Sequence, residues 1–348
     1  MRPPKQSEQL YHELKSAIEC RRIIPGSQLS SEPELAEKYS VARNTLRKVL
    51  AVLEQEGLLK RVVGKGTFVR EDVILPVIYF LVPSPDYMTL FNVYAVWTRE
   101  FLQGAMVAAA EYNCRLEPLA VSPCNEAPME LQRLERLDAN SMVVIPGLAY
   151  YPLFEFLMQK KCKVMLIQDQ SRYVDLYSGK AKNWGRLEMK RRQGIHQCIQ
   201  DLYNAGCRKT ALAYSFISDE THPMRQGYIE AVKDYQEPCF IDVREAEKSE
   251  LRSFYEREKF DSLVVDTRFI TPMSHGSINE LLGLPESVKV VIFNSCESLG
   301  HVENVFEKFK FSRLQMGYDA VRYLLSDEVV FRSYEPTVER SVKLQDQP

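Results

Sequence analysis

The sequence predicts an α/β protein in which a small, mostly helical N-terminal module precedes a larger body of parallel β-sheets in two lobes. Residues 1–70 contain helix patterns and carry 13 Lys and Arg against 8 Asp and Glu, whereas the remaining residues carry 32 against 39. From Val77 onward, short apolar runs alternate with segments of helix length, which is typical of parallel strands covered by helices. A basic module on an acidic body favours a nucleic-acid-binding part joined to a part with another role.

The composition is that of a soluble, folded protein. The chain has 348 residues, of which 45% are hydrophobic and 26% charged, enough for two or three separate cores. The N-terminus is polar and no uncharged run of 18 residues occurs, so we expect a cytoplasmic protein without a membrane span. The eight cysteines are scattered without a C-x-x-C pair, so we expect reduced thiols and no metal site.

The N-terminal module begins with an amphipathic helix that should end near Ile24-Pro25-Gly26. Its apolar residues recur at helical spacing: Leu10, Leu14, Ala17 and Ile18. A capping box follows, in which Ser31 caps a short helix, Glu34–Lys38, and Glu34 reaches back to the Ser31 N–H. Pro33 suits the first turn of such a helix.

A third helix is predicted from about Arg43 to Glu56. Its buried stripe consists of Leu46, Val49, Leu50 and Leu53, which leaves Asn44, Arg47 and Lys48 on the opposite side. Two β-rich runs, 60–63 and 67–69, flank Gly64-Lys65-Gly66 and predict a hairpin with a thin tip. Together these elements predict a winged helix-turn-helix whose longer helix enters the major groove of DNA.

This module resembles the DNA-binding domain of the GntR family over nearly all of residues 5–70. The matching runs are Pro25-Gly26-Ser27-Gln28-Leu29, Ser31-Glu32, Glu34-Leu35-Ala36, Val41-Ala42-Arg43-Asn44-Thr45-Leu46-Arg47, Leu53-Glu54-Gln55-Glu56-Gly57-Leu58-Leu59 and Gly64-Lys65-Gly66-Thr67-Phe68-Val69. The resemblance implies that the partner is a double-stranded DNA operator. The implied contacts are Ser31, Arg43, Asn44, Thr45, Arg47, Lys48, Gly64, Lys65 and Gly66.

The residue types in this set suit DNA. Arginine can bind guanine or phosphate, asparagine can read adenine, and a lysine at a thin tip can reach the backbone or the minor groove. Two positions depart from the family pattern. Pro33 replaces a usual arginine, and Ala42 replaces a serine or threonine, which removes a helix cap of about 1 kcal/mol.

Residues 71–75 should form a linker between a DNA-binding domain, residues 1–70, and a ligand-sensing and dimerisation domain, residues 76–348. Strands are expected at Val77–Val82, Met142–Ile145, Lys163–Ile167, Thr210–Tyr214, Asp261–Val265 and Val288–Phe293. Helices are expected at Arg99–Tyr112, Leu153–Lys160, Gln193–Ala205, Met224–Lys233 and Ser277–Leu282. About 270 residues of this pattern point to two lobes.

The body resembles the LacI-type regulatory domain, which is similar to periplasmic sugar-binding proteins. The cues are Phe101-Leu102-Gln103-Gly104, Gly206-Cys207-Arg208-Lys209, Arg225-Gln226-Gly227-Tyr228, Phe260-Asp261, Val290-Val291-Ile292-Phe293-Asn294 and Met316-Gly317. A GntR head on such a body is the architecture of the arabinose repressor subgroup. It implies a periplasmic-binding-protein-like α/β fold and a repressor controlled by a small-molecule effector, a sugar or a sugar derivative.

The effector should bind where parallel strands end, because two lobes place those ends around one crevice. Candidate residues are Asp169, Tyr214, Asp266 and Asn294 at strand ends, together with Arg225, onto which the effector arginine of the LacI-type family maps. An arginine with carboxylate and amide acceptors suits sugar hydroxyls. The family pattern is altered here, since Val265-Asp266 stands for an Asn-Asp pair and Asn294 for an aspartate.

The basic triplet Lys190-Arg191-Arg192 aligns with an acidic Asp-Asn segment of that family. Runs of charge usually lie on a solvated face, so we interpret the triplet as surface. The alternative is that it favours an anionic effector, such as a sugar acid or a sugar phosphate.

Two functions of different classes therefore stand: a ligand-controlled regulator, and a regulator whose body is only a dimerisation or partner-binding scaffold. An enzyme is not expected, because the sequence shows no nucleophile elbow, phosphate loop or metal constellation, and no cofactor is expected either. One winged domain reads only a half-site, so we expect a homodimer on a near-palindromic operator.

Overall fold

The computed structural model describes residues 6–19, 22–70, 75–83, 93–121, 131–147, 150, 153–169, 181, 184–214, 220, 222–242, 248–266, 274–295, 302–326 and 328–340. Its contacts divide the chain into two units, Met1–Ile78 with Met106–Glu117, and Tyr79–Ala105 with Pro118–Pro348. Residues 71–74 of the expected linker lie outside the described residues, so the domain boundary stays a prediction.

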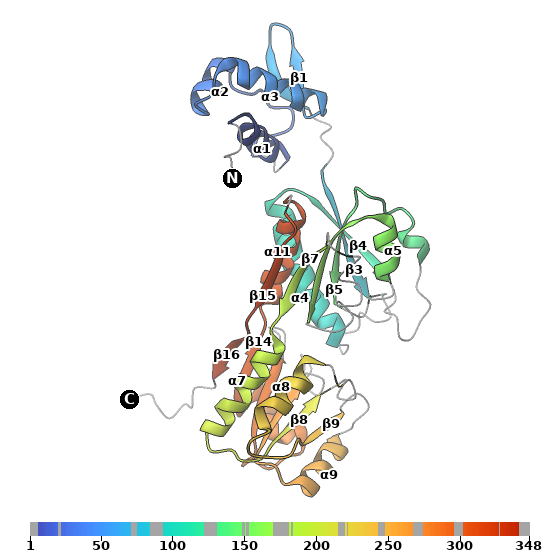
Figure 1. The fold of residues 1–348 in the computed structure, drawn as a ribbon, viewed down its shortest axis with the longest axis vertical. Coiled ribbons are helices and arrows are strands. Elements are labelled where there is room, and N and C mark those ends of the chain that lie inside the picture. The colour runs from blue at the N-terminus through green and yellow to red at the C-terminus, as the bar shows by residue number, and fades with distance from the viewer. Residues whose placement is uncertain are drawn as a thin grey trace. The chain divides into compact units, whose positions relative to one another are not determined.

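The N-terminal part of the first unit, drawn in blue in Figure 1, is the predicted winged helix-turn-helix. Its elements are α1 (Gln6–Glu19), α2 (Glu32–Lys38), α3 (Arg43–Gln55), β1 (Leu59–Val62) and β2 (Gly66–Val69). The apolar stripes of the helices meet in one core, where Leu14, Ile18 and Leu46 are fully buried. The strands β1 and β2 pair antiparallel, with Leu59 opposite Val69. Helix α2 begins two residues earlier than predicted, directly after its cap.

The first six-stranded sheet, most of which belongs to the second unit, has the strand order β15-β7-β6-β5-β3-β4. Its strands are β3 (Val77–Pro83), β4 (Arg115–Val121), β5 (Met142–Pro146), β6 (Lys163–Asp169), β7 (Gly185–Met189) and β15 (Phe331–Tyr334). The strands β5, β6, β7 and β15 pair in parallel. Helix α11 (Arg313–Leu324) packs on β5, β6 and β7. Helices α4 (Val93–Glu111) and α5 (Leu153–Lys160) and the 3-10 turn Leu131–Leu134 belong to this part of the chain.

The second sheet has the order β16-β14-β12-β10-β8-β9, all parallel except the antiparallel edge strand β16. Its strands are β8 (Thr210–Tyr214), β9 (Phe240–Asp242), β10 (Ser262–Asp266), β12 (Lys289–Ser295), β14 (Val305–Lys310) and β16 (Thr337–Arg340). A short pair joins β11 (Gly276–Ser277) to β13 (Val302–Glu303). The helices are α7 (Arg191–Asn204), α8 (Pro223–Val232), α9 (Lys248–Glu258) and α10 (Ile278–Leu282), and α7 packs on α8.

Each sheet has its own apolar core. The chain passes from one sheet to the other at Met189–Arg191, Lys310–Arg313 and Tyr334–Thr337. Two of these crossovers are joined, because the Lys190 N–H donates to the Tyr334 carbonyl at 3.0 Å and the Lys190 Nζ pairs with Glu335 at 2.6 Å. The first residues of α7 and α11 therefore lie at the passages between the lobes.

The predicted parallel α/β body is confirmed, and each predicted strand coincides with β3, β5, β6, β8, β10 or β12 within one or two residues. The strands β7 and β14, whose buried and half-buried residues alternate, and the helices α9 and α11 were not predicted from the sequence. Among the described residues, none of the helices is long and apolar enough to cross a membrane.

Candidate DNA-binding surface and effector site

The capping box predicted at Ser31 is present. The Ser31 hydroxyl accepts a hydrogen bond from the Glu34 N–H at 3.5 Å, and Glu34 Oε2 accepts one from the Ser31 N–H at 2.9 Å. This reciprocal pair fixes the start of α2 and leads directly into the turn before α3. The Ser31 contact with DNA stays a prediction.

Helix α3 separates an apolar face from a basic one. Its buried residues are Leu46, Val49, Leu50 and Leu53, whereas Arg43, Asn44, Arg47 and Lys48 are exposed and Thr45 is half-buried. The N-cap residue Ala42 makes no side-chain cap, as the missing hydroxyl predicts, and no acidic residue lies in the first turn. The exposed N-terminal face of α3 therefore presents cations and an amide to solvent.

Arg47 on this face is engaged by the preceding helix. Its Nε donates to Glu32 Oε2 at 2.7 Å, while 61% of the Arg47 side chain stays exposed. An exposed pair of this kind contributes about 0–1 kcal/mol. The ion pair thus orients the guanidinium group, and breaking it to free Arg47 for a phosphate would cost little energy.

The β1–β2 hairpin has the thin tip that the sequence predicts. Gly64 and Gly66 have φ values of 73° and 113°, which L side chains rarely adopt, and Lys65 is exposed between them. The Gln28 Nε2 donates to the Lys65 carbonyl at 2.6 Å, and a Cβ added at Gly66 would lie 2.6 Å from the same nitrogen. Gln28 therefore supports the tip from the body of the module.

The C-terminal end of α3 is fixed to α1 by a polar group of three. The Tyr11 hydroxyl donates to Glu56 Oε1 at 2.5 Å, and Lys15 Nζ lies 3.0 Å from Glu56 Oε2. Burial acts to raise the pKa of Glu56, but the hydrogen bonds from Tyr11 and Lys15 outweigh it and hold that pKa below its usual value. The basic face of α3 is thereby held in a fixed orientation on the module.

In the second unit, Arg225 lies in the first turn of α8, and Gly227, Tyr228 and Ala231 face inward as predicted. The guanidinium lies over the ring of Phe240, with its carbon 5.2 Å from the ring centroid, and 3.8 Å from the exposed Glu220. Only 17% of the Arg225 side chain is exposed. Its cationic group therefore lies between an aromatic face and a carboxylate.

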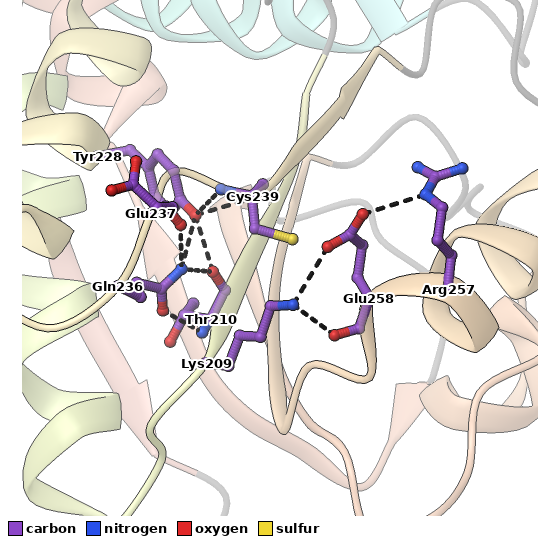
Figure 2. Close-up of polar contacts among 8 residues, drawn as sticks. All are labelled: Lys209, Thr210, Tyr228, Gln236, Glu237, Cys239, Arg257 and Glu258. Atoms are coloured by element: carbon purple, nitrogen blue, oxygen red, sulfur yellow. Dashed lines mark hydrogen bonds and ion pairs between the residues drawn. The ribbon is translucent and has the colours of Figure 1, made fainter.

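Helix α8 is held on the second sheet by the buried Tyr228 hydroxyl. Figure 2 shows this hydroxyl beside Cys239 and Thr210: it lies 2.8 Å from the Thr210 carbonyl and accepts the Cys239 N–H at 2.9 Å. Gln236 completes the group by bonding both backbone polar atoms of Thr210. Burial raises the pKa of Tyr228 well above its usual value, so the hydroxyl stays protonated. This network positions the helix that carries Arg225.

The Tyr214 hydroxyl, at the end of β8, is hydrogen-bonded to His222, the N-cap residue of α8. The His222 Nδ1 accepts the Met224 N–H at 3.2 Å, which leaves Nε2 to donate to the Tyr214 hydroxyl at 2.9 Å. The Tyr214 hydroxyl and Arg225 thus lie at the same end of α8. Whether either binds an effector stays a prediction.

Asn294 ends β12 inside a buried cluster of charged side chains. The residue is fully buried with φ at 63°, and its Oδ1 accepts hydrogen bonds from both Arg313 and Arg191, the latter at 3.5 Å. Arg313 also donates to Glu100 at 3.2 Å and to the Ser295 carbonyl at 2.9 Å. The guanidinium carbons of Arg191 and Arg313 lie 5.6 and 5.2 Å from the ring centroid of Trp97.

This cluster corrects the interpretation of the basic triplet. Arg191 is 5% exposed, so a solvated face is wrong for the middle residue. Lys190 is half-buried and pairs with Glu335, whereas Arg192 is exposed and pairs with Glu230. Arg313, Glu100 and Trp97 were not among the site residues predicted from the sequence. A signal for Arg313 was present, because it stands three residues before Met316-Gly317, which the family resemblance had already placed in this helix.

For two of the predicted effector residues the structure describes the backbone alone. Asp169 and Asp266 end β6 and β10, but their side chains lie outside the described residues. Among the described side chains, Asn294 joins Arg191 and Arg313, whereas Arg225 joins Phe240 and Glu220. No group of three His, Cys, Asp or Glu side chains that could hold a metal ion occurs in the part of the chain that the structure describes.

Comparison with known proteins identifies the N-terminal module. Residues 6–69 match the model of the bacterial regulatory proteins of the gntR family. The transcriptional regulator SmoD of Agrobacterium fabrum is 31% identical over 131 residues, which cover 37% of this chain and 50% of SmoD. The chain thus spans about half the length of that relative and less of others, such as a quarter of the repressor NagR of Bacillus subtilis.

The body has relatives of its own fold. The arabinose metabolism transcriptional repressor of Geobacillus stearothermophilus is 21% identical over 351 residues, covering 91% of this chain and 89% of the repressor. Among solved structures, the glucose-galactose binding protein GanP of the same organism superposes with a TM-score of 0.53 at 15% identity, over 76% of this chain and 97% of GanP. A ribose-bound LacI family regulator from Enterococcus faecium gives 0.52 at 12%, over 76% and 97%. Residues 6–69 thus belong to the bacterial regulatory gntR family, and they are joined to a body with the fold of LacI-type regulators and sugar-binding proteins.

Proposed function

We propose that the chain is a sequence-specific DNA-binding transcription repressor, acting as a homodimer, whose body binds a sugar or a sugar derivative and thereby changes operator binding. The observation that carries the proposal is the basic, exposed N-terminal face of α3, opposite a fully apolar face, in a gntR-family module. The names of the relatives, all transcriptional regulators, support it. The fold shared with sugar-binding proteins supports a sugar-like effector in the body.

The test begins with selection of bound duplexes from a random DNA library by the full chain. The selected sites should be near-palindromic, because two heads of a symmetric dimer read two half-sites. Arg43→Ala should weaken binding to the selected duplex by about 1–3 kcal/mol in a fluorescence anisotropy titration. Arg252→Ala, which removes an exposed arginine of α9, is the matched control and should leave binding unchanged. Equal binding by Arg43→Ala and the control would remove α3 from the interface.

Lys65 tests the tip of the hairpin separately. Lys65→Ala should weaken selected and unrelated duplexes alike, and make the dependence of log Kd on log salt less steep by about one, because one phosphate contact is lost. A loss confined to the selected sequence would instead assign Lys65 to base recognition.

A further inference from the structure

Two buried arginines begin two helices at the passages between the lobes. Arg191 is the first residue of α7, and Arg313 is the first residue of α11. A cation at a helix N-terminus faces the positive end of the helix dipole, so this position is electrostatically unfavourable. Burial of both side chains adds a desolvation cost, since the residues are 5% and 2% exposed. Negatively charged groups beside the two guanidinium groups offset both costs.

The two guanidinium groups converge on one place. Both donate to Asn294 Oδ1, and both lie over the ring of Trp97. Glu100 Oε2, 3.2 Å from Arg313 Nη1, shows that a carboxylate binds to this cluster. The positive groups are thus concentrated at a strand end, the edge of a parallel sheet where ligands bind in this class of fold.

Further hydrogen-bonding atoms point to a ligand. Asn294 Nδ2 and Ser295 Oγ are buried and have no hydrogen-bond partner among the described residues. Both residues are at most 1% exposed. An unsatisfied buried donor costs about 1–3 kcal/mol, so the Asn294 amide, whose oxygen accepts from both guanidinium groups, is suited to bind an acceptor oxygen of a ligand.

We propose that the effector is an anion, and that its carboxylate or phosphate binds between Arg191 and Arg313 with the amide of Asn294. The inference deepens the proposed function by naming the charge of the ligand and the residues that bind it. Arginine is the side chain suited to both groups, because its planar fork matches carboxylate and phosphate oxygens. Glu100, the carboxylate already in the cluster, competes with the ligand. The effector is then a sugar acid or a sugar phosphate and not a neutral sugar.

The protein carries a reporter for this site. It contains two tryptophans, and Trp184 is buried in the core of the first sheet against Phe154. In a Trp184→Phe variant of the full chain, the emission of Trp97 alone reports on the two guanidinium groups. The probes are matched sets built on glucose, galactose, arabinose and ribose: the neutral sugar, its aldonic acid and its terminal phosphate.

One set should contain an acid or a phosphate that changes Trp97 emission and raises the melting temperature of the wild-type chain by about 5 °C at roughly one hundred times its Kd. The neutral member of that set should do neither. The acid and phosphate members separate the two sources of negative charge. A neutral sugar that acts as strongly as its acid and phosphate, or no response to any acid or phosphate, would overturn the proposal.

Three substitutions assign the response to the cluster. Arg191→Gln should weaken binding of the active probe by roughly tenfold or more, because a buried charged donor is lost. Glu100→Gln should strengthen it, since a competing negative charge is removed, and a merely structural role would not produce this opposite sign. Arg192→Gln, whose side chain is exposed and paired with Glu230, is the matched control and should bind as wild type does. Equal binding by Arg191→Gln and Arg192→Gln would contradict the assignment.

The outcomes separate this inference from the proposed function. A neutral sugar that binds the body and alters operator affinity would support the proposed function and contradict the inference that the effector is an anion. An acid that binds at Arg191 and Arg313, in a chain that shows no sequence-selective DNA binding, would support the anion site and contradict the proposed function.

Discussion

Arg47 of α3 donates its Nε–H to Oε2 of Glu32 at 2.7 Å, so an arginine predicted to contact DNA is held by a carboxylate of the preceding helix in the free protein. The two residues lie 15 positions apart, and the ion pair depends on how α2 and α3 meet. If Arg47 contacts DNA as predicted, a phosphate has to compete with Glu32 for the same guanidinium group. We therefore expect the ion pair to weaken DNA binding by the module.

Replacing Glu32 tests this competition. Glu32→Gln should tighten operator binding by up to about 1 kcal/mol, the range of an exposed ion pair. Arg47→Ala should weaken it by about 1–3 kcal/mol. Both are measured by fluorescence anisotropy, with Glu13→Gln on α1 as a control for total charge. Weaker binding by Glu32→Gln would mean that the carboxylate aims Arg47 at DNA instead of competing for it.

The hydroxyl of Tyr228 should be important for the stability of the second sheet. Tyr228→Phe removes the acceptor of the Cys239 N–H and one of two donors to the Thr210 carbonyl, so it should lower the free energy of unfolding by about 1–3 kcal/mol in urea titrations. Tyr235→Phe is the matched control, because Tyr235 is 38% exposed and stacks on Tyr203. An equal effect of the two substitutions would show that the network contributes nothing measurable.

Glu307 should make the body less stable as the pH rises. Burial raises the pKa of Glu307, the hydrogen bond from Arg340 opposes this, and Asp201 adds to it, so the pKa in the folded state lies above its usual value. A raised carboxyl pKa gives stability that is present below the unfolded pKa and is lost as the pH passes through the folded pKa. Glu307→Gln should therefore reduce the difference between urea midpoints at pH 4, below the usual pKa of a glutamate, and pH 8. The same change of the urea midpoint with pH in Glu307→Gln as in wild type would exclude this carboxyl as the source of the pH dependence. Glu339→Gln, at an exposed residue of the edge strand β16, serves as the control.

Arg225 should act on the effector response and not on DNA. Arg225→Ala should bind the selected duplex as wild type does, because the residue lies on α8 of the second unit, outside the DNA-binding module. Its Kd for the ligand identified with the sugar sets should rise by roughly tenfold or more, so the response to that ligand should be lost. Isothermal titration measures the affinity and anisotropy the DNA response. A wild-type response would show that the arginine over Phe240 plays no part in ligand binding.

The DNA-binding module could be predicted from sequence nearly to the residue, because its signals are local. The capping box at Ser31 involves neighbours three positions apart, and the stripe of α3 follows from the helical period. The buried strands of the body are recognisable for a similar reason: β8 and β12 are continuous apolar runs, as central parallel strands should be.

The charged cluster could not be predicted in this way. Arg191 is buried only because crossovers between the lobes meet there, and its contact with Asn294 spans 103 positions. In sequence, three consecutive cations resemble a solvated face, but of these three Arg192 is exposed, Lys190 is half-buried and Arg191 is buried. Strands such as β14 were missed because Glu307 and Lys308 interrupt the apolar run, although Glu307 is itself buried.

The central claim is that ligand binding in the body changes DNA binding by the head. The most direct measurement is the operator Kd of the full chain, by fluorescence anisotropy on the selected duplex, with and without a saturating concentration of the ligand that the sugar sets identify. The account predicts a change of roughly fivefold or more in the wild-type chain, because coupling between two sites is a free-energy difference between two forms. At the same ligand concentration, Arg191→Gln should show little change. An unchanged operator Kd in wild-type protein that has demonstrably bound its ligand would contradict the account and leave the body as a scaffold.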